Sequence, residues 1–256
     1  MVRRLFPRGA GDLLWQILLF CGAYWLYRLV RGQVFMQSAA AFDHARDIVS
    51  LERSLHVFAE PSIQHWAIGT GFLDDAASWM YLNTHFVVTT CTLAFIYLFR
   101  NEHYYFVRNM FMVAMGLALL GYVVYPTAPP RMLPELGFVD SVSDFTGVSS
   151  DSNVNALFNP YAAVPSMHVG FALMLSVPMI RMAKRRLTKL LWGVYAPIVT
   201  AVVVLTANHW IFDAVTGALV AAVAAVAAQT VFARVRPRAW AWAPEQEALP
   251  APARAG

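Results

Sequence analysis

The sequence predicts an all-α, polytopic membrane protein whose six transmembrane helices form one bundle. Of the 256 residues, 59% are hydrophobic and 13% are charged, and the mean hydropathy is +0.51. A soluble domain has roughly 25% charged residues, about twice as many. The apolar residues form continuous runs of about 18 or more, long enough for a helix to cross a bilayer. These runs do not alternate with polar residues, which disfavours a transmembrane β-barrel.

The apolar runs place the spans along the chain. The six predicted spans cover about residues 12–30, 76–99, 106–125, 165–182, 187–206 and 209–233. They make up one membrane domain of residues 12–235, preceded by an N-terminal segment of residues 1–11. Pro126-Thr-Ala-Pro-Pro-Arg131 ends the third span, because proline cannot continue a helix. The Pro- and Ala-rich residues 236–256 predict a disordered tail.

Between the first and second spans, residues 31–74 are mixed in character. Four apolar residues recur at helical spacing, with polar residues such as Glu52 between them: Ile48, Leu51, Leu55 and Phe58. This pattern predicts an amphipathic helix lying at the membrane surface. Pro61 should end that helix, and residues 62–73 predict a second short interfacial segment.

The basic residues predict the orientation, because they concentrate on the cytoplasmic side of membrane proteins. Six spans put both termini on one side, and that side carries 14 of the 19 Lys and Arg residues. We therefore expect a multi-pass plasma-membrane protein with both termini in the cytoplasm. Segments 31–75 and 126–164 and the turn 206–209 are then extracytoplasmic. The basic residues lie beside apolar runs, so the net charge of +4 does not indicate a nucleic-acid partner.

This topology brings ionisable residues from three spans to the extracytoplasmic face. Arg131 follows the third span, His168 begins the fourth and His209 begins the sixth. His209 and Asp213 are four residues apart and therefore share a helical face. The carboxylate could hold one imidazole nitrogen as N–H and leave the other as a nucleophile. The alternative is a pair that only stabilises the bundle, but ionisable residues in spans are rare and usually functional.

The stretch Pro165-Ser166-Met167-His168 predicts a helix start with affinity for phosphate. Ser166 could add a hydroxyl, and His168, one turn in, could protonate a departing oxygen. Arg131 follows two prolines, and a guanidinium on a rigid segment suits bidentate phosphate binding. The alternatives are a capping serine, an interfacial histidine and a snorkelling arginine.

Four further residues are candidates for the same site, with packing as the alternative for each. Asn208 flanks His209 and could bind phosphate, whereas Tyr81, His85 and Tyr161 could line the site. Two histidines and an aspartate could instead bind zinc. There is no His-Glu-x-x-His motif, and a His–Asp pair beside an arginine fits oxyanion chemistry better. We therefore expect neither a metal nor another cofactor.

At these residues the sequence resembles the membrane-bound type 2 phosphatidic acid phosphatase superfamily, over about residues 50–235. The superfamily signature has three parts: Lys-x6-Arg-Pro, Pro-Ser-Gly-His and Ser-Arg-x5-His-x3-Asp. The second part reads Pro165-Ser166-Met167-His168 here, and the third keeps His209 and Asp213 at the right spacing. The first part survives as Pro129-Pro130-Arg131.

The chain departs from that signature at its other basic positions. Val124 stands at the lysine position, and Val202 and Val203 stand at the Ser-Arg positions. The inositol phosphorylceramide synthase branch, an inositolphosphotransferase branch, lacks these cations in a similar way. It also shares a Tyr-x3-His feature, here Tyr81 and His85. The sequence is therefore most similar to that branch, which favours a phosphodiester or lipid-linked phosphate as substrate.

The resemblance implies a role for each matching residue. His209 would attack phosphorus and form a phosphohistidine, with Asp213 orienting it. His168 would protonate the leaving group and later activate the acceptor, and Arg131 would bind the phosphoryl oxygens.

The resemblance also implies a reaction class. The expected activity transfers a phosphoryl head group from a phospholipid or polyprenyl phosphate in the bilayer to a lipid or alcohol acceptor. A lipid phosphate phosphatase, with water as acceptor, is the alternative. A membrane transporter is a more remote one, because transporters place their sites near the bilayer midplane.

Overall fold

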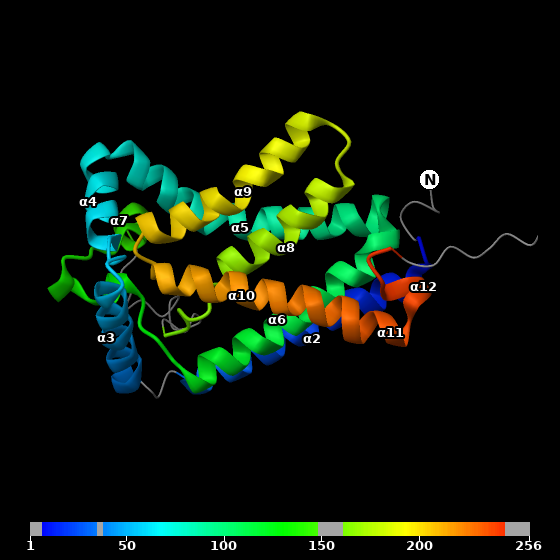
Figure 1. Ribbon diagram of the computed structural model, residues 1–256, viewed down its shortest axis with the longest axis horizontal. Coiled ribbons are helices and arrows are strands. Elements are labelled where there is room, and N and C mark those ends of the chain that lie inside the picture. The colour runs from blue at the N-terminus through cyan, green and yellow to red at the C-terminus, as the bar shows by residue number, and fades with distance from the viewer. Residues whose placement is uncertain (1–6, 35–37, 148–160, 244–256) are drawn as a thin grey trace, which may run out of the picture.

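The computed structural model describes residues 7–34, 38–147 and 161–243. Long helices run side by side along the molecule, and shorter helices lie across one end (Figure 1). The long helices are α2 (Ala10–Val34), α5 (Phe72–Phe99), α6 (Asn101–Val124), α8 (Met167–Met182), α9 (Arg186–Leu205) and α10 (Ile211–Ala227). The helices α3 (Ser38–Ser54) and α4 (Glu60–Thr70) lie across what we call the α3–α4 end.

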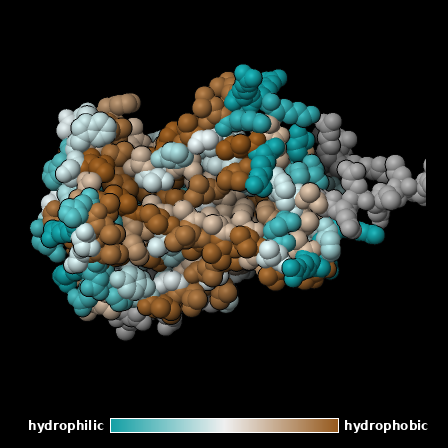
Figure 2. Space-filling view, in the orientation of Figure 1, coloured by the Kyte–Doolittle hydropathy of each residue, from teal (hydrophilic) through white to brown (hydrophobic). Residues whose placement is uncertain are grey.

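The chain is an all-helical protein of the multi-pass membrane type. Four helices in the described residues are long and apolar enough to cross a membrane: Phe72–Phe99, Asn101–Val124, Arg186–Leu205 and Ile211–Val235. They coincide with the predicted second, third, fifth and sixth spans. Hydrophobic residues cover the middle of the visible face, with hydrophilic residues toward both ends (Figure 2).

The other two predicted spans fall on shorter apolar helices. Residues 12–30 overlap α2, whose described apolar part is Ala10–Leu26, and residues 165–182 overlap Met167–Met182. The latter is short because Pro165 and Ser166 precede the helix, with Ser166 at its N-cap position. Four of the six predicted spans are thus long apolar helices of the described residues, and the other two coincide with shorter apolar helices.

The apolar face predicted for the helix after the first span is wrong, because the structure buries a different set of residues. The helix α3 ends at Ser54, before Leu55 and Phe58, and Leu51 and Leu55 are exposed. The buried residues of α3 are Ala41, Ala45, Ile48, Val49 and Glu52. Its buried stripe therefore includes a carboxylate that the sequence pattern assigned to the polar face.

Two glycines let the start of α8 sit close to its neighbours. A Cβ atom on Gly121 of α6 would lie 2.8 Å from Pro165 Cδ. A Cβ atom on Gly217 of α10 would lie 2.2 Å from the Ser166 carbonyl oxygen. Since neither distance is possible for real atoms, only glycine allows this approach, which brings the first turn of α8 against α6 and α10.

The segment after α6 is built from short turns at the α3–α4 end. They are η2 (Pro130–Met132), η3 (Pro134–Leu136) and α7 (Ser141–Thr146). Trp210 packs against this segment: its side chain is fully buried, and its indole N–H donates to the Ala128 carbonyl at 3.0 Å. The rest of the predicted polar loop, residues 148–160, lies outside the described residues.

The opposite end of the bundle carries α11 (Ala233–Val235) and α12 (Pro237–Trp240), reached from α10 through a π-helical turn, η5 (Ala228–Phe232). The tail that we predicted to be disordered from residue 236 therefore begins as a helix. Trp240 and Trp242 pack against the cluster of buried residues around α6. Packing of two tryptophans outweighs the Pro- and Ala-rich composition there, and residues 244–256 lie outside the described residues.

Candidate active site

The turn between α9 and α10 carries His209. The helix α9 ends at Leu205 and α10 begins at Ile211, two residues after the predicted start of the span. Ala207 adopts a positive φ of 49°, and the His209 N–H donates to the Val203 carbonyl at 3.1 Å. His209 is therefore held by the turn, ahead of the helix, rather than by the helix itself.

His209 and Asp213 nevertheless form the predicted pair. His209 Nδ1 lies 3.2 Å from Asp213 Oδ2, and the Asp213 side chain is fully buried. The same oxygen accepts the Trp210 N–H at 2.9 Å, because Asp213 is the third residue of α10 and folds back over its start. A carboxylate only accepts hydrogen bonds, so Nδ1 carries the proton and Nε2 keeps a free lone pair.

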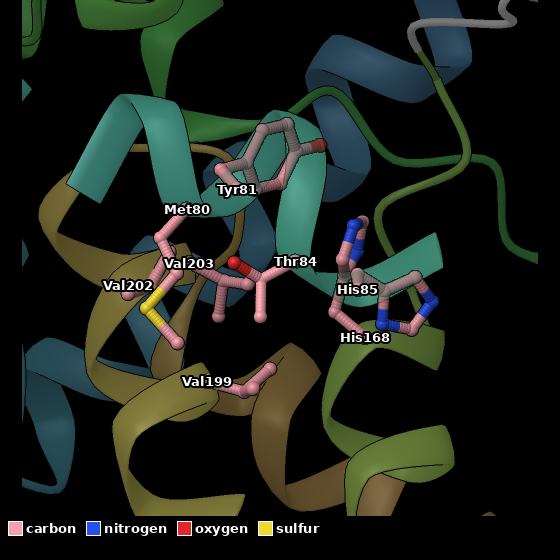
Figure 3. A pocket seen from close by; sticks show the side chains of 8 residues that line it. All are labelled: Met80, Tyr81, Thr84, His85, His168, Val199, Val202 and Val203. Carbon is pink, nitrogen blue, oxygen red and sulfur yellow. The ribbon is translucent and has the colours of Figure 1, made fainter. Parts of the chain in front are cut away.

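His168 lies beside His209, on the first turn of α8. The centroids of the two imidazole rings are 5.6 Å apart. On its other side His168 meets two residues of α5: the His85 ring at 4.3 Å and the Tyr81 ring, stacked at 4.7 Å. Figure 3 shows the His85 and His168 rings next to each other. The structure thus brings both of these predicted lining residues against His168.

A small cavity lies beside His168. Its volume is about 10 Å³, and its lining residues are Met80, Tyr81, Thr84, His85, His168, Val199, Val202 and Val203 (Figure 3). This is about the space of one water molecule. Val202 and Val203, at the Ser-Arg positions of the signature, form part of its apolar wall. Val124, at the lysine position, is 68% exposed on α6 and lines a different, apolar groove.

Arg131 is bound to the turn that carries His209. Its backbone N–H donates to the Ala207 carbonyl at 2.9 Å, and Nη1 donates to Asn208 Oδ1 at 2.5 Å. Asp140 Oδ2 lies 3.6 Å from Nε. Asn208 Nδ2 in turn donates to the carbonyl and hydroxyl oxygens of Thr206. Asn208, a predicted phosphate ligand, therefore holds Arg131 in place with its side-chain oxygen.

The remaining two candidates occupy different surroundings. Ser166 is fully buried, its N–H donates to the Asp213 carbonyl at 3.0 Å, and its hydroxyl has no hydrogen-bond partner among the described residues. Tyr161 packs with Trp210 in a hydrophobic cluster and meets the Phe42 ring of α3 edge-on at 6.1 Å. Tyr161 is thus part of the packing behind the turn, on the α3 side.

Two buried glutamates also contact the start of α10, and the sequence analysis missed their role. Glu60 Oε1 accepts the Ile211 N–H at 3.0 Å, and Glu52 Oε1 accepts the Phe212 N–H at 2.8 Å. With Asp213 on the Trp210 N–H, three carboxylates bind three consecutive N–H groups. A signal for Glu52 was available in the sequence. It lies on the same face of the predicted helix as the small residues Ala41 and Ala45, which mark the buried side of α3.

The zinc alternative concerned His168, His209 and Asp213. In the part of the chain that the structure describes, no group of three or more His, Cys, Asp or Glu residues is arranged to hold a metal ion. The side chains that contact His209 are the His168 imidazole ring and the buried Asp213 carboxylate.

The fold is that of a helical protein with several candidate membrane-spanning helices, and the described site brings two imidazole rings and a buried carboxylate together. A family model described as the PAP2 superfamily matches residues 46–227, so the chain belongs to that superfamily. The match includes all nine predicted site residues and both buried glutamates. No curated protein and no solved structure matches the chain. Membership assigns the chain to lipid phosphoester chemistry in general, whether hydrolysis or transfer.

Proposed function

We propose that the protein is an integral membrane phosphotransferase that acts on lipid phosphoesters through a phosphohistidine on His209. The observation that carries this proposal is the 3.2 Å contact from His209 Nδ1 to Asp213, which leaves Nε2 as the nucleophile on an imidazole adjacent to His168. The proposed donor is a phospholipid or polyprenyl phosphate, and the acceptor is a lipid or other alcohol.

The proposed reaction has two steps. First, His209 Nε2 attacks phosphorus, the bond from phosphorus to the leaving oxygen breaks, and His168 gives that oxygen a proton. Next, the acceptor hydroxyl gives its proton to His168 and attacks phosphorus, which releases His209. Arg131 binds the non-bridging oxygens in both steps, and Asp213 stabilises the positive charge that His209 acquires.

The apolar wall of the site supports a phosphodiester as donor. Val202 and Val203 stand where the superfamily signature has Ser-Arg, and Val124 faces outward. A phosphomonoester carries about −1.5 to −2 charges at neutral pH, whereas a diester carries one. One arginine matches the single charge, so among the proposed donors a phospholipid diester fits this site better than a polyprenyl phosphate, which is a monoester, and head-group transfer fits it better than monoester hydrolysis. Head-group transfer is also the reaction of the inositolphosphotransferase-like branch that the sequence resembles.

An apolar groove supports a lipid as substrate. It has a volume of about 400 Å³ and lies between α6 and α10, lined by Leu117, Leu120, Gly121, Val124, Tyr125, Leu219, Val220 and Val223. Gly121 abuts Pro165, next to Ser166, so one end of the groove lies close to the site. An acyl or prenyl chain in this groove would leave its phosphate near the α3–α4 end.

Filling the groove is expected to separate long-chain from short-chain substrates. In Val223→Trp we expect kcat/KM for a long-chain donor to fall about tenfold or more, because the indole occupies the chain's place. Turnover of a short-chain, water-soluble donor should stay near the wild-type value. Val226→Trp is the matched control, since Val226 is exposed on the same helix and does not line the groove. Equal losses with both donors would argue against a chain in the groove.

The proposed topology has six spans in the plasma membrane, with both termini in the cytoplasm and the site on the extracytoplasmic face. The clustering of Arg and Lys near the end opposite α3–α4 supports it. In cells, a membrane-impermeant maleimide should label Ser143→Cys but not Lys184→Cys, in a background with Cys21 and Cys91 replaced by alanine. The reverse pattern would invert the topology.

The test of the function follows phosphorus. Purified protein would receive phosphatidylinositol, phosphatidylglycerol, phosphatidate or a polyprenyl phosphate, each labelled at phosphorus, with and without a lipid alcohol. We expect label to enter a new lipid only when the alcohol is present. Release of label into water in both cases would favour the second candidate, a lipid phosphate phosphatase. The cavity beside His168, with space for about one water molecule, is the observation that supports that candidate.

A further inference from the structure

Two acidic residues outside the proposed reaction are buried at the α3–α4 end. The Glu52 residue on α3 is 2% exposed and the Glu60 residue on α4 is 0% exposed. Buried carboxylates are rare unless they are bound by charges or hydrogen bonds. These two bind the first N–H groups of α10, where the helix dipole favours negative charge.

The hydrogen bonds indicate which of the two acids carries a proton. Both oxygens of Glu60 accept backbone N–H groups: Oε1 from Ile211 at 3.0 Å and Oε2 from Ala59 at 3.0 Å. Glu52 Oε1 accepts the Phe212 N–H, whereas no described donor reaches Glu52 Oε2. The two carboxyl groups lie side by side, because the Ile211 and Phe212 N–H groups that they accept are consecutive along the chain. Two ionised carboxylates side by side would repel each other, and Glu52 Oε2, which is buried without a described donor, is the oxygen placed to hold a proton between them.

The electrostatics agree with that assignment. Burial, the adjacent Glu60 carboxyl group and the nearby negative charge of Asp213 raise the pKa of Glu52 to about 9. The Phe212 N–H opposes this shift and lowers the pKa. Glu52 is therefore neutral at pH 7.

We propose that Glu52 and Glu60 form a carboxyl pair sharing one proton, and that this pair positions the turn bearing His209. Glu52 is the donor of the shared proton, and Glu60 is its acceptor. The expected effect of the pair on turnover rests on the function proposed above, whereas the pair itself is inferred from burial and hydrogen bonds alone.

The pair acts through the start of α10. It binds the N–H groups of Ile211 and Phe212, and Asp213 binds that of Trp210 through the same oxygen that contacts His209. A small shift of this helix start would therefore move the Asp213 carboxylate away from the imidazole. The proton also keeps a second negative charge away from Asp213 and from the phosphate that must enter. Glu52 and Glu60 are positioning residues, since neither contacts the reacting atoms.

The test compares alanine and glutamine at the two positions. In Glu52→Ala, turnover should fall about tenfold or more, because Glu60 and the Phe212 N–H both lose a buried partner. Glu52→Gln should restore turnover to within about threefold of wild type, since its amide NH₂ donates to Glu60 and its carbonyl accepts from Phe212. Turnover of Glu60→Gln should remain low. Both Glu60 oxygens accept backbone N–H groups, so the amide NH₂ would place a donor against the N–H of either Ala59 or Ile211. Glu135→Gln, exposed at the same end, is the matched control.

A pH series supplies a readout that does not need activity. The folded state keeps a proton on Glu52 that the unfolded chain loses above about pH 4.5. The stability from this proton is complete below that pH and is lost as the pH rises through about 9. The thermal midpoint of wild type should therefore fall more steeply between pH 5 and 9 than that of Glu52→Gln. If the pH slopes matched, or if Glu52→Gln lost as much turnover as Glu52→Ala, the pair would be refuted. If the wild-type protein had neither transfer nor hydrolysis activity, the proposed function would fail, and the slopes of the thermal midpoint against pH would still test the carboxyl pair.

Discussion

His209→Ala is expected to abolish turnover while the protein remains folded. The substitution removes the proposed nucleophile, and loss of a nucleophile in comparable sites lowers kcat by about 10⁴-fold or more. The fold should persist because Asp213 still accepts the Trp210 N–H, and Trp210 remains anchored to Ala128. The measurement is transfer of labelled phosphorus from donor to acceptor lipid. A parallel trap should find an acid-labile label on wild-type protein and none on the variant.

The control for this variant is His65→Ala. His65 is an exposed histidine on α4, at the same end of the molecule, and its ring bonds to the Pro61 carbonyl. Its loss should leave turnover unchanged. If His209→Ala kept activity within about tenfold of wild type, the phosphohistidine mechanism would be abandoned.

Asp213→Asn is expected to have a large but smaller effect, for a reason specific to this geometry. Both bonds to Asp213, from His209 and from Trp210, fall on Oδ2, and Oδ1 has no partner among the described residues. An asparagine can place its carbonyl oxygen at the Oδ2 position and keep both bonds. The tautomer of His209 is then preserved, and the negative charge is what is lost.

That lost charge sets the size of the effect. Two unit charges about 4 Å apart interact by roughly 4 kcal/mol at an effective dielectric constant of about 20, which corresponds to about 10³-fold in rate. We expect kcat to fall by about 10²- to 10³-fold in Asp213→Asn, with little change in KM. Asp213→Ala should fall further and also unfold at lower temperature, because it loses the helix cap. Equal activity of the two variants would mean that the charge, rather than the tautomer, is the whole contribution.

Much of the fold could be predicted, because a long apolar run that crosses a bilayer must pair its own backbone groups and therefore forms a helix. The predicted span 76–99 and the observed α5 end at the same residue, Phe99. Helix starts were less predictable. The sixth span was predicted to begin at His209, but the positive φ of Ala207 and the carboxylates on the N–H groups delay α10 to Ile211. Such tertiary bonds leave no local pattern in the sequence.

The candidate site could likewise be predicted only in part. Short motifs located His168, His209, Asp213 and Arg131, and the structure brings the first three together and ties Arg131 to the His209 turn. The motifs could not locate Glu52 or Glu60, whose function depends on two helices lying across the start of a third. The predicted apolar face of α3 was wrong because Ala41 and Ala45, although small, mark the buried side and Leu51 does not. Side-chain size decides how closely helices approach, and hydropathy alone does not record it.

The groove between α6 and α10 opens sideways, where Leu120, Val124, Leu219 and Val223 are all more than half exposed. A substrate that enters there diffuses in two dimensions and never passes through water. The concentration that governs its capture is then its mole fraction in the surrounding lipid, rather than its molarity in the sample. Diluting the donor with inert lipid at constant total donor would slow such an enzyme as surely as removing donor would, and a KM in molar units would not describe it.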